Sequence, residues 1–150
     1  MIEWKEETAM NTALDLAKYI VTKCVKEKRP ISNLQLQKIL YYIQKAFLKN
    51  GNTAFFDDIQ AWTFGPVVPN VYYYFCAYGA MPISFSFDNI SIENYGDTEI
   101  INQIVEEKRE LDPWEMVAET HKRGGAWEQI YQNGAGNHKL IPRELIRTAG

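Results

Sequence analysis

Strong start and stop signals for helices punctuate this chain, and they constrain its fold more than any other feature of the sequence. Ser32 followed by Gln35 forms a capping box, in which two of the free amides at a helix start are satisfied by side chains. Asn50-Gly51 supplies the left-handed stop that helix ends favour. Between these signals runs an apolar stripe at helical spacing: Leu36, Leu40, Ile43 and Phe47.

Similar signals bound several other helices. Thr12 can cap a helix that has Asp15 in its first turn. Pro30 ends this helix. Asp112-Pro113 places a capping residue before a proline at the first helical position, and Gly124-Gly125 ends that helix. Besides the helix that follows Ser32, the expected helices cover about residues 12–28, 69–78, 98–110, 113–122 and 126–132, and a last one opens at Pro142.

Residues 55–87 are rich in aromatic side chains, since eleven of the twenty aromatic residues of the chain lie there. Asp58 to Phe64 alternates enough to form a short extended segment, and we interpret Gly65-Pro66 as a sharp turn from that strand to a helix. Trp62 and Phe64 are core residues in this interpretation. The alternative is an aromatic groove for a partner protein, because Trp and Tyr are enriched at interface hot spots.

A hairpin is expected further along the chain. Apolar residues alternate with serines from residue 83 to 87, and Asp88-Asn89 can turn the chain so that Phe87 pairs with Ile90 and Phe85 with Ile92. The expected fold is therefore mainly α, an α+β fold with a minor strand component. We expect residues 1–150 to form a compact multi-helix single domain with one short strand or hairpin.

Composition and charge limit the classes of protein to which this chain can belong. A hydrophobic fraction of 46% and a charged fraction of 23% are ordinary for a soluble globular protein, and the net charge of −3 argues against a broadly basic nucleic-acid binder. Residues 1–50 carry a net +4 and residues 51–110 a net −7, which suggests internal complementarity or a polar binding surface. The N-terminus lacks the pattern of a secretory signal, and no apolar run approaches the ~20 residues of a membrane span. We expect a cytoplasmic protein without a membrane partner.

No catalytic or metal-binding pattern is visible. Two histidines, His121 and His138, are too few for a histidine-rich metal site, and Cys24 and Cys76 lie far apart in apolar stretches that predict buried thiols. A cysteine could still meet His121 in space as nucleophile and base, but nothing in the sequence supports that pairing. We therefore expect no enzyme, no cofactor and no metal.

Three segments, in order along the chain, resemble a known family. They are Leu34-x-Leu36-Gln37-Lys38-Ile39-Leu40-Tyr41-Tyr42, then Ile59-x-Ala61-Trp62-x-Phe64-Gly65-Pro66-Val67-Val68-Pro69-x-Val71-Tyr72, and finally Thr120-His121-x-x-Gly124-x-Ala126-Trp127. From about Ala13 to Ile146, the chain resembles the Panacea domain family, whose members are called SocA-like antitoxins or phage-associated proteins. Ile39 and Phe64 depart from the family's usual Leu and Tyr, and both keep the apolar bulk.

The resemblance implies a mostly helical domain that neutralises a toxin encoded beside it, often in a prophage or another mobile element. In one branch of the family, the protein is an adaptor that delivers its toxin to a AAA+ protease. The implied partners are thus a cognate toxin and, for that branch, the protease. The motif positions carried over as candidate partner-binding residues are Gln37, Lys38, Tyr41, Trp62, Gly65, Pro66, Tyr72, His121 and Trp127.

Two other functions stay open at this stage. A prophage regulator that binds DNA would need a basic face, and a small-molecule enzyme would need a cysteine beside His121 in a cleft. Lys38 is not required for the packing of its helix, because the apolar stripe is complete without it. Its ammonium group is expected to reach solvent or an acidic neighbour.

Overall fold

The computed structural model describes residues 12–88, 90 and 97–150, and most of this part of the chain is helical. Its α-helices are α1 (Ala13–Lys26), α2 (Asn33–Lys49), α3 (Pro69–Tyr74), α4 (Thr98–Lys108), α5 (Pro113–Thr120), α6 (Ala126–Tyr131) and α7 (Arg143–Ala149). Two 3-10 helices, η1 (Cys76–Tyr78) and η3 (Gln132–Gly134), and three strands, β1 (Gln60–Trp62), β2 (Gly65–Val67) and β3 (Lys139–Leu140), complete it. The mainly helical fold class is confirmed.

The helix starts follow the local signals of the sequence. The Thr12 side chain accepts a hydrogen bond from the first turn of α1. The capping box of α2 is closed in both directions, from the Gln35 amide to Ser32 Oγ at 3.3 Å and from the Ser32 amide to Gln35 Oε1 at 2.9 Å. Asp112 accepts from the Trp114 amide at 2.8 Å at the start of α5. These bonds satisfy amides that a helix start leaves free, which is why local sequence locates these helices.

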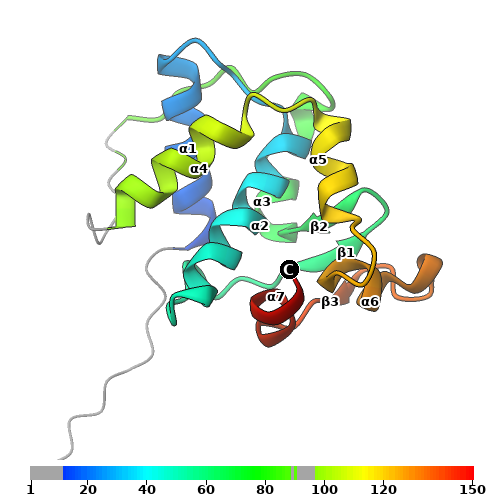
Figure 1. The fold of residues 1–150 in the computed structure, drawn as a ribbon. Helices are drawn as coiled ribbons and strands as arrows, with labels where there is room; N and C mark the ends of the chain where they lie inside the picture. Colours follow the sequence, from blue (N-terminus) through cyan, green and yellow to red (C-terminus); the bar gives the residue numbers. More distant parts are fainter. Residues whose placement is uncertain (1–11, 89, 91–96) are drawn as a thin grey trace, which may run out of the picture.

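Helix α2 runs through the middle of the molecule (Figure 1). It packs against α1, α3, α4, α5, α7 and β2. In Figure 1, α1 and α4 lie on one side of it, and α5 and the small sheet lie on the other. Its predicted apolar stripe is buried, with Leu36, Leu40 and Ile43 fully enclosed in the core. Each such side chain stabilises the fold by roughly 1.5–3 kcal/mol relative to leaving it in water.

The strands form one antiparallel sheet in the order β2-β1-β3. Trp62 pairs with Gly65, so the turn between β1 and β2 is Thr63-Phe64. Gly65-Pro66 therefore opens a strand, and the sequence-based interpretation of these residues as a strand-to-helix turn is wrong. The chain enters α3 only after Val68. A proline is tolerated in β2 because this strand lies at the sheet edge, where a missing N–H breaks no central ladder.

The third strand and the expected hairpin also differ from the prediction. β3 pairs Leu140 with Gln60, although its two residues form no alternating pattern that a sequence could reveal. Residues 83–88, expected as half of a hairpin, form no strand. Ile83 is instead buried and donates its amide to the Ile31 carbonyl at 2.8 Å, while 55% of Phe85 is exposed. Ile92, the expected partner of Phe85, lies outside the described residues.

The uneven charge along the sequence is partly resolved between α1 and α4. Lys23 at the end of α1 lies 3.3 Å from Glu106, and Arg29 lies 3.5 Å from Glu110. Basic groups of the first fifty residues thus meet acidic groups of the middle segment. Each pair has at least one exposed partner, so it contributes only about 0–1 kcal/mol to stability.

An added side chain at Gly65 would conflict with the buried residues around it. Its φ is +114°, and a Cβ atom would lie 2.7 Å from Thr120 Oγ1 and 2.8 Å from Lys38 Cε. We expect Gly65→Ala to lower the free energy of unfolding by roughly 1–3 kcal/mol through backbone strain, and further through this crowding. Gly51 is the control, because its φ is +79° but nothing lies within 4 Å of its Cβ position. Urea denaturation should show the larger loss for Gly65→Ala; equal losses would contradict the crowding.

Candidate functional site

Four polar side chains of α2 are buried, and each bonds a backbone group between residues 54 and 72. Asn33, Gln37, Lys38 and Gln44 form what we call the buried polar face of α2. Gln44 holds the start of the segment, because its side chain accepts from the Ala54 amide at 2.9 Å and donates to the Phe55 carbonyl at 2.7 Å. A buried backbone group without a partner is costly, so these bonds let an irregular segment enter the core.

Two amides, one helical turn apart, hold the end of the same segment. Gln37 Oε1 accepts from the Val68 amide at 2.8 Å, and its Nε2 donates to Asn33 Oδ1 at 2.9 Å. Asn33 Nδ2 in turn donates to the Tyr72 carbonyl at 3.1 Å. One face of α2 therefore reaches both the end of β2 and the helix α3 that follows it.

Lys38, which follows Gln37 in α2, is fully buried. Its Nζ donates to the Pro66 carbonyl at 3.1 Å, and among the described residues no carboxylate pairs with it. Burial lowers the pKa of Lys38 to about 7, because the charged form loses its solvation there. The expectation that its ammonium group reaches solvent or an acidic neighbour is thus wrong. The missing Cβ of Gly65 makes the space that this side chain occupies.

His121 and Trp127 tie the C-terminal helices to β1. The Trp127 indole donates to the Trp62 carbonyl at 2.8 Å, and its ring stacks between His121, with centroids 3.6 Å apart, and Tyr131, at 4.5 Å. Burial, and then the nearby Lys38, lower the pKa of His121. Trp127 itself is buried, so its contacts account for its place in the third motif without a partner molecule.

An aromatic groove of about 480 Å³ lies between α2, the β1–β2 hairpin, α3 and the start of α5. Trp62 and Tyr72 meet edge to face with centroids 5.0 Å apart, and Phe64 and Trp114 do so at 5.4 Å. Phe64 and Trp114 remain 51% and 61% exposed. The groove is lined by Asn33, Leu34, Gln37, Trp62, Thr63, Phe64, Val67, Tyr72, Gly79, Ala80, Trp114 and His138.

The structure divides the candidate residues of the sequence motifs into separate groups. Those that line the groove are Gln37, Trp62 and Tyr72. Those that meet one another in the core are Lys38, Gly65 and Pro66. Those that line neither the groove nor the second cleft described below are Tyr41, His121 and Trp127.

The motifs did not single out the two most exposed aromatic rings of the groove. Phe64 lies in the second motif but was interpreted as core, and Trp114 lies in no motif. Their separation of fifty residues along the chain hides their contact. The sequence does place Trp114 directly after Pro113, in the first turn of α5, but this position alone does not indicate a contact with Phe64.

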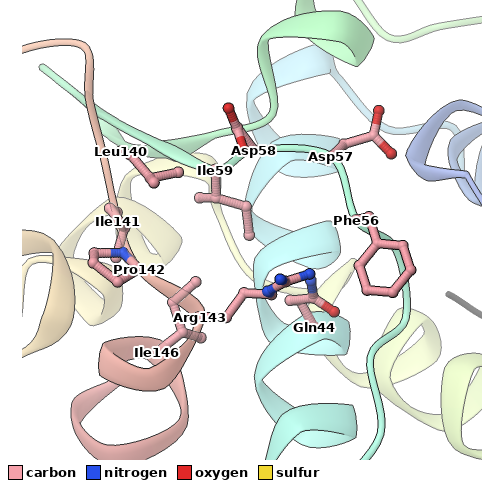
Figure 2. Close-up of a pocket in the computed structure, with 10 residues that line it drawn as sticks. All are labelled: Gln44, Phe56, Asp57, Asp58, Ile59, Leu140, Ile141, Pro142, Arg143 and Ile146. Atoms are coloured by element: carbon pink, nitrogen blue, oxygen red, sulfur yellow. The ribbon is translucent and has the colours of Figure 1, made fainter. Parts of the chain in front are cut away.

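A second cleft, of about 250 Å³, shares no lining residue with the groove (Figure 2). Arg143 from α7 reaches across it and lies over the Phe56 ring at 4.9 Å. Asp57 at the rim is already bonded, since its two carboxylate oxygens accept from the Ala13 amide at 2.9 Å and from Asn70 at 3.1 Å. Leu140 adds an exposed apolar surface to the same cleft.

The two cysteines differ in their surroundings. Burial raises the pKa of the Cys24 thiol, whereas a nucleophilic cysteine needs a lowered pKa. Cys76 is exposed, contrary to the expectation of a buried thiol, because it lies in the short helix η1 at the surface. Within residues 12–88, 90 and 97–150, no cluster of three His, Cys, Asp or Glu side chains could hold a metal ion, and no helix has the length and apolarity of a membrane span.

Comparison with known proteins identifies relatives. The family described as SocA-like antitoxins with the Panacea domain matches residues 36–128, which run from α2 to α6. Antitoxin SocA of Caulobacter vibrioides (strain NA1000 / CB15N) is 32% identical over 135 residues, which cover 82% of this chain and 71% of that protein. No solved structure matches the chain significantly.

The burial of Lys38 predicts a characteristic dependence of stability on pH. Its pKa falls from 10.5 in an exposed lysine to about 7 in the fold, so between these values the unfolded chain binds a proton that the folded chain does not. The free energy of unfolding should therefore rise with pH across this window by about 1.4 kcal/mol per pH unit, and the full penalty applies below pH 7.

Lys38→Met is the control for this effect, because methionine is similar in shape and carries no charge. The difference in unfolding free energy between the parent chain and Lys38→Met should shift in favour of the parent between pH 7 and 10. Urea denaturation across this range measures it. Parallel pH curves for the two proteins would show that Lys38 titrates as an exposed lysine does.

Proposed function

This chain belongs to the family of SocA-like antitoxins with the Panacea domain, and we propose that it neutralises a toxin by binding that protein directly. The toxin is encoded beside its gene, in a prophage or another mobile element. The observation that carries this proposal is the aromatic groove, whose rings at Phe64 and Trp114 are exposed in a chain with a compact apolar core. Exposed aromatic side chains around a hollow are typical of protein-binding hot spots.

The chemistry of the groove favours a protein over a nucleic acid. Its two buried amides, Asn33 and Gln37, already bond each other and the backbone of the chain. No Lys or Arg is among the described residues that line it, whereas binding to phosphates relies on such cations. A site of this kind supports a binding role without an enzymatic step.

A second surface supports a finer version of the proposal, in which the protein is an adaptor for a AAA+ protease. An adaptor must hold its toxin and the protease together, so it needs two surfaces that do not overlap. The groove and the cleft beside Phe56 and Arg143 meet this requirement, since they share no lining residue. We assign the toxin to the groove and the protease to the cleft.

The first experiment finds the toxin and separates the two versions. Each neighbouring gene is expressed alone and together with this chain, and growth is scored. A gene that stops growth alone, and does so no longer with the chain, encodes the toxin; without any such gene, the proposal fails. The half-life of that toxin then decides between the versions, because an adaptor shortens it in cells with the protease, whereas a blocking antitoxin leaves it unchanged.

Truncation of the exposed rings tests the groove itself. We expect Phe64→Ala combined with Trp114→Ala to weaken toxin binding by about thirtyfold or more and to abolish growth rescue, because hot-spot residues contribute about 2 kcal/mol or more. The melting temperature should change little, since both rings are half-exposed or more. Phe85→Ala is the matched control, because Phe85 is 55% exposed but lines neither hollow. Full rescue by the double variant would remove the groove from the toxin interface.

A further inference from the structure

Four exposed or half-exposed aromatic rings outside the groove have a lysine or arginine of the same chain above them, whereas the exposed rings of Tyr73 and Phe85 have none among the described residues. Lys18 lies over Tyr74 at 5.2 Å and over Phe87 at 5.4 Å. Lys108 lies over Tyr42 at 4.4 Å. Arg143 lies over Phe56 at 4.9 Å, as seen in the cleft of Figure 2. A positive charge is attracted to the electron-rich face of a ring, so each of these rings already has a cation–π contact within the chain.

The rings of the groove differ, because no lysine or arginine of the described residues lies over them. Trp62 and Tyr72 meet at an interplanar angle of 65°, and Phe64 and Trp114 meet at 82°. Both pairs line the same groove, so their rings can serve as walls of a partial aromatic cage. Cages of this kind bind ammonium and guanidinium groups in other proteins.

The charges beside Trp114 have the sign that such a ligand requires. Asp112 and Glu115 flank Trp114, and both are exposed. Between Lys49 and Lys108 the sequence contains no lysine or arginine, and this stretch supplies Trp62, Phe64 and Tyr72. A cation that approaches Trp114 therefore meets carboxylates beside that ring, and no lysine or arginine among the described lining residues repels it.

His138 covers part of the Trp62 end of the groove. Its imidazole stacks on Trp62 with centroids 4.3 Å apart, so one face of that indole is already covered. Trp114, with 61% of its surface exposed, offers the more open indole of the two. The corner that Trp114 forms with Phe64 is thus the best place for a cation.

We propose that this corner binds a lysine or arginine side chain of the toxin, held against the Trp114 ring and attracted by Asp112 and Glu115. The proposal rests on the proposed function, since it names the side chain that the groove takes from its partner. It distinguishes this groove from an apolar socket, which would take a leucine or phenylalanine equally well.

A small probe tests the cage without the toxin. The indole N–H signal of Trp114, assigned by its loss in Trp114→Leu, is followed by NMR during titration with n-butylguanidinium chloride or with 1-butanol at matched ionic strength. We expect the cation to bind about two- to fivefold more tightly than the alcohol. Equal binding of both probes, or no shift with either, would overturn the cage.

Fluorinated tryptophans at position 114 test the same contact with the toxin. Each fluorine weakens the negative face of the ring while its size changes little, so toxin affinity should fall stepwise from mono- to trifluorotryptophan. Fluorinated phenylalanines at Phe85 are the control and should leave affinity unchanged. If fluorination at 114 has no effect but Trp114→Ala loses binding, the groove binds the toxin through an apolar contact and this inference is overturned. If Trp114→Ala also binds normally, the toxin does not use the groove and the proposed surface falls as well.

Discussion

The hydrogen bonds from the buried polar face of α2 to the backbone of residues 54–72 are the interaction on which the rest of this structure depends. The segment contains two three-residue strands and several turns, so most of its backbone groups have no partner in a long ladder. Ala54, Phe55 and Val68 are nevertheless buried. Gln44 and Gln37 supply the missing partners from a single helix, and this lets an irregular segment lie against the core.

This support from behind explains how the aromatic residues of the segment become available on the outside. With its backbone fastened to α2, the β1–β2 hairpin does not need Trp62 or Phe64 to anchor it in the core. The rings are free to form the walls of the groove, where Trp114 from α5 meets them. Lys38 shows that this arrangement has a cost, because its amine satisfies the Pro66 carbonyl at the expense of its own solvation.

The sequence predicts the parts of this fold that depend on neighbouring residues. Caps such as Thr12 and Ser32 and stops such as Asn50-Gly51 act within a few residues, so the helices appear near their expected places. β3 and the burial of Ile83 depend on contacts with distant segments, and neither was predicted. The same limit applies to the site. Motif residues such as Lys38 and Gly65 proved to be internal supports, whereas Trp114, an exposed wall of the groove, belongs to no motif.

The way α2 holds its neighbour has a consequence for how this surface can diversify. All four of its buried polar side chains bond only backbone atoms, or a backbone atom and each other. Every amino acid offers the same carbonyl and, proline apart, the same amide. Replacement of Phe64, Tyr72 or Trp114 therefore changes the shape and charge preference of the groove without removing any of these bonds. The fold separates the part that must stay the same from the part that meets another molecule. The same scaffold can then carry grooves that differ in shape and in charge preference.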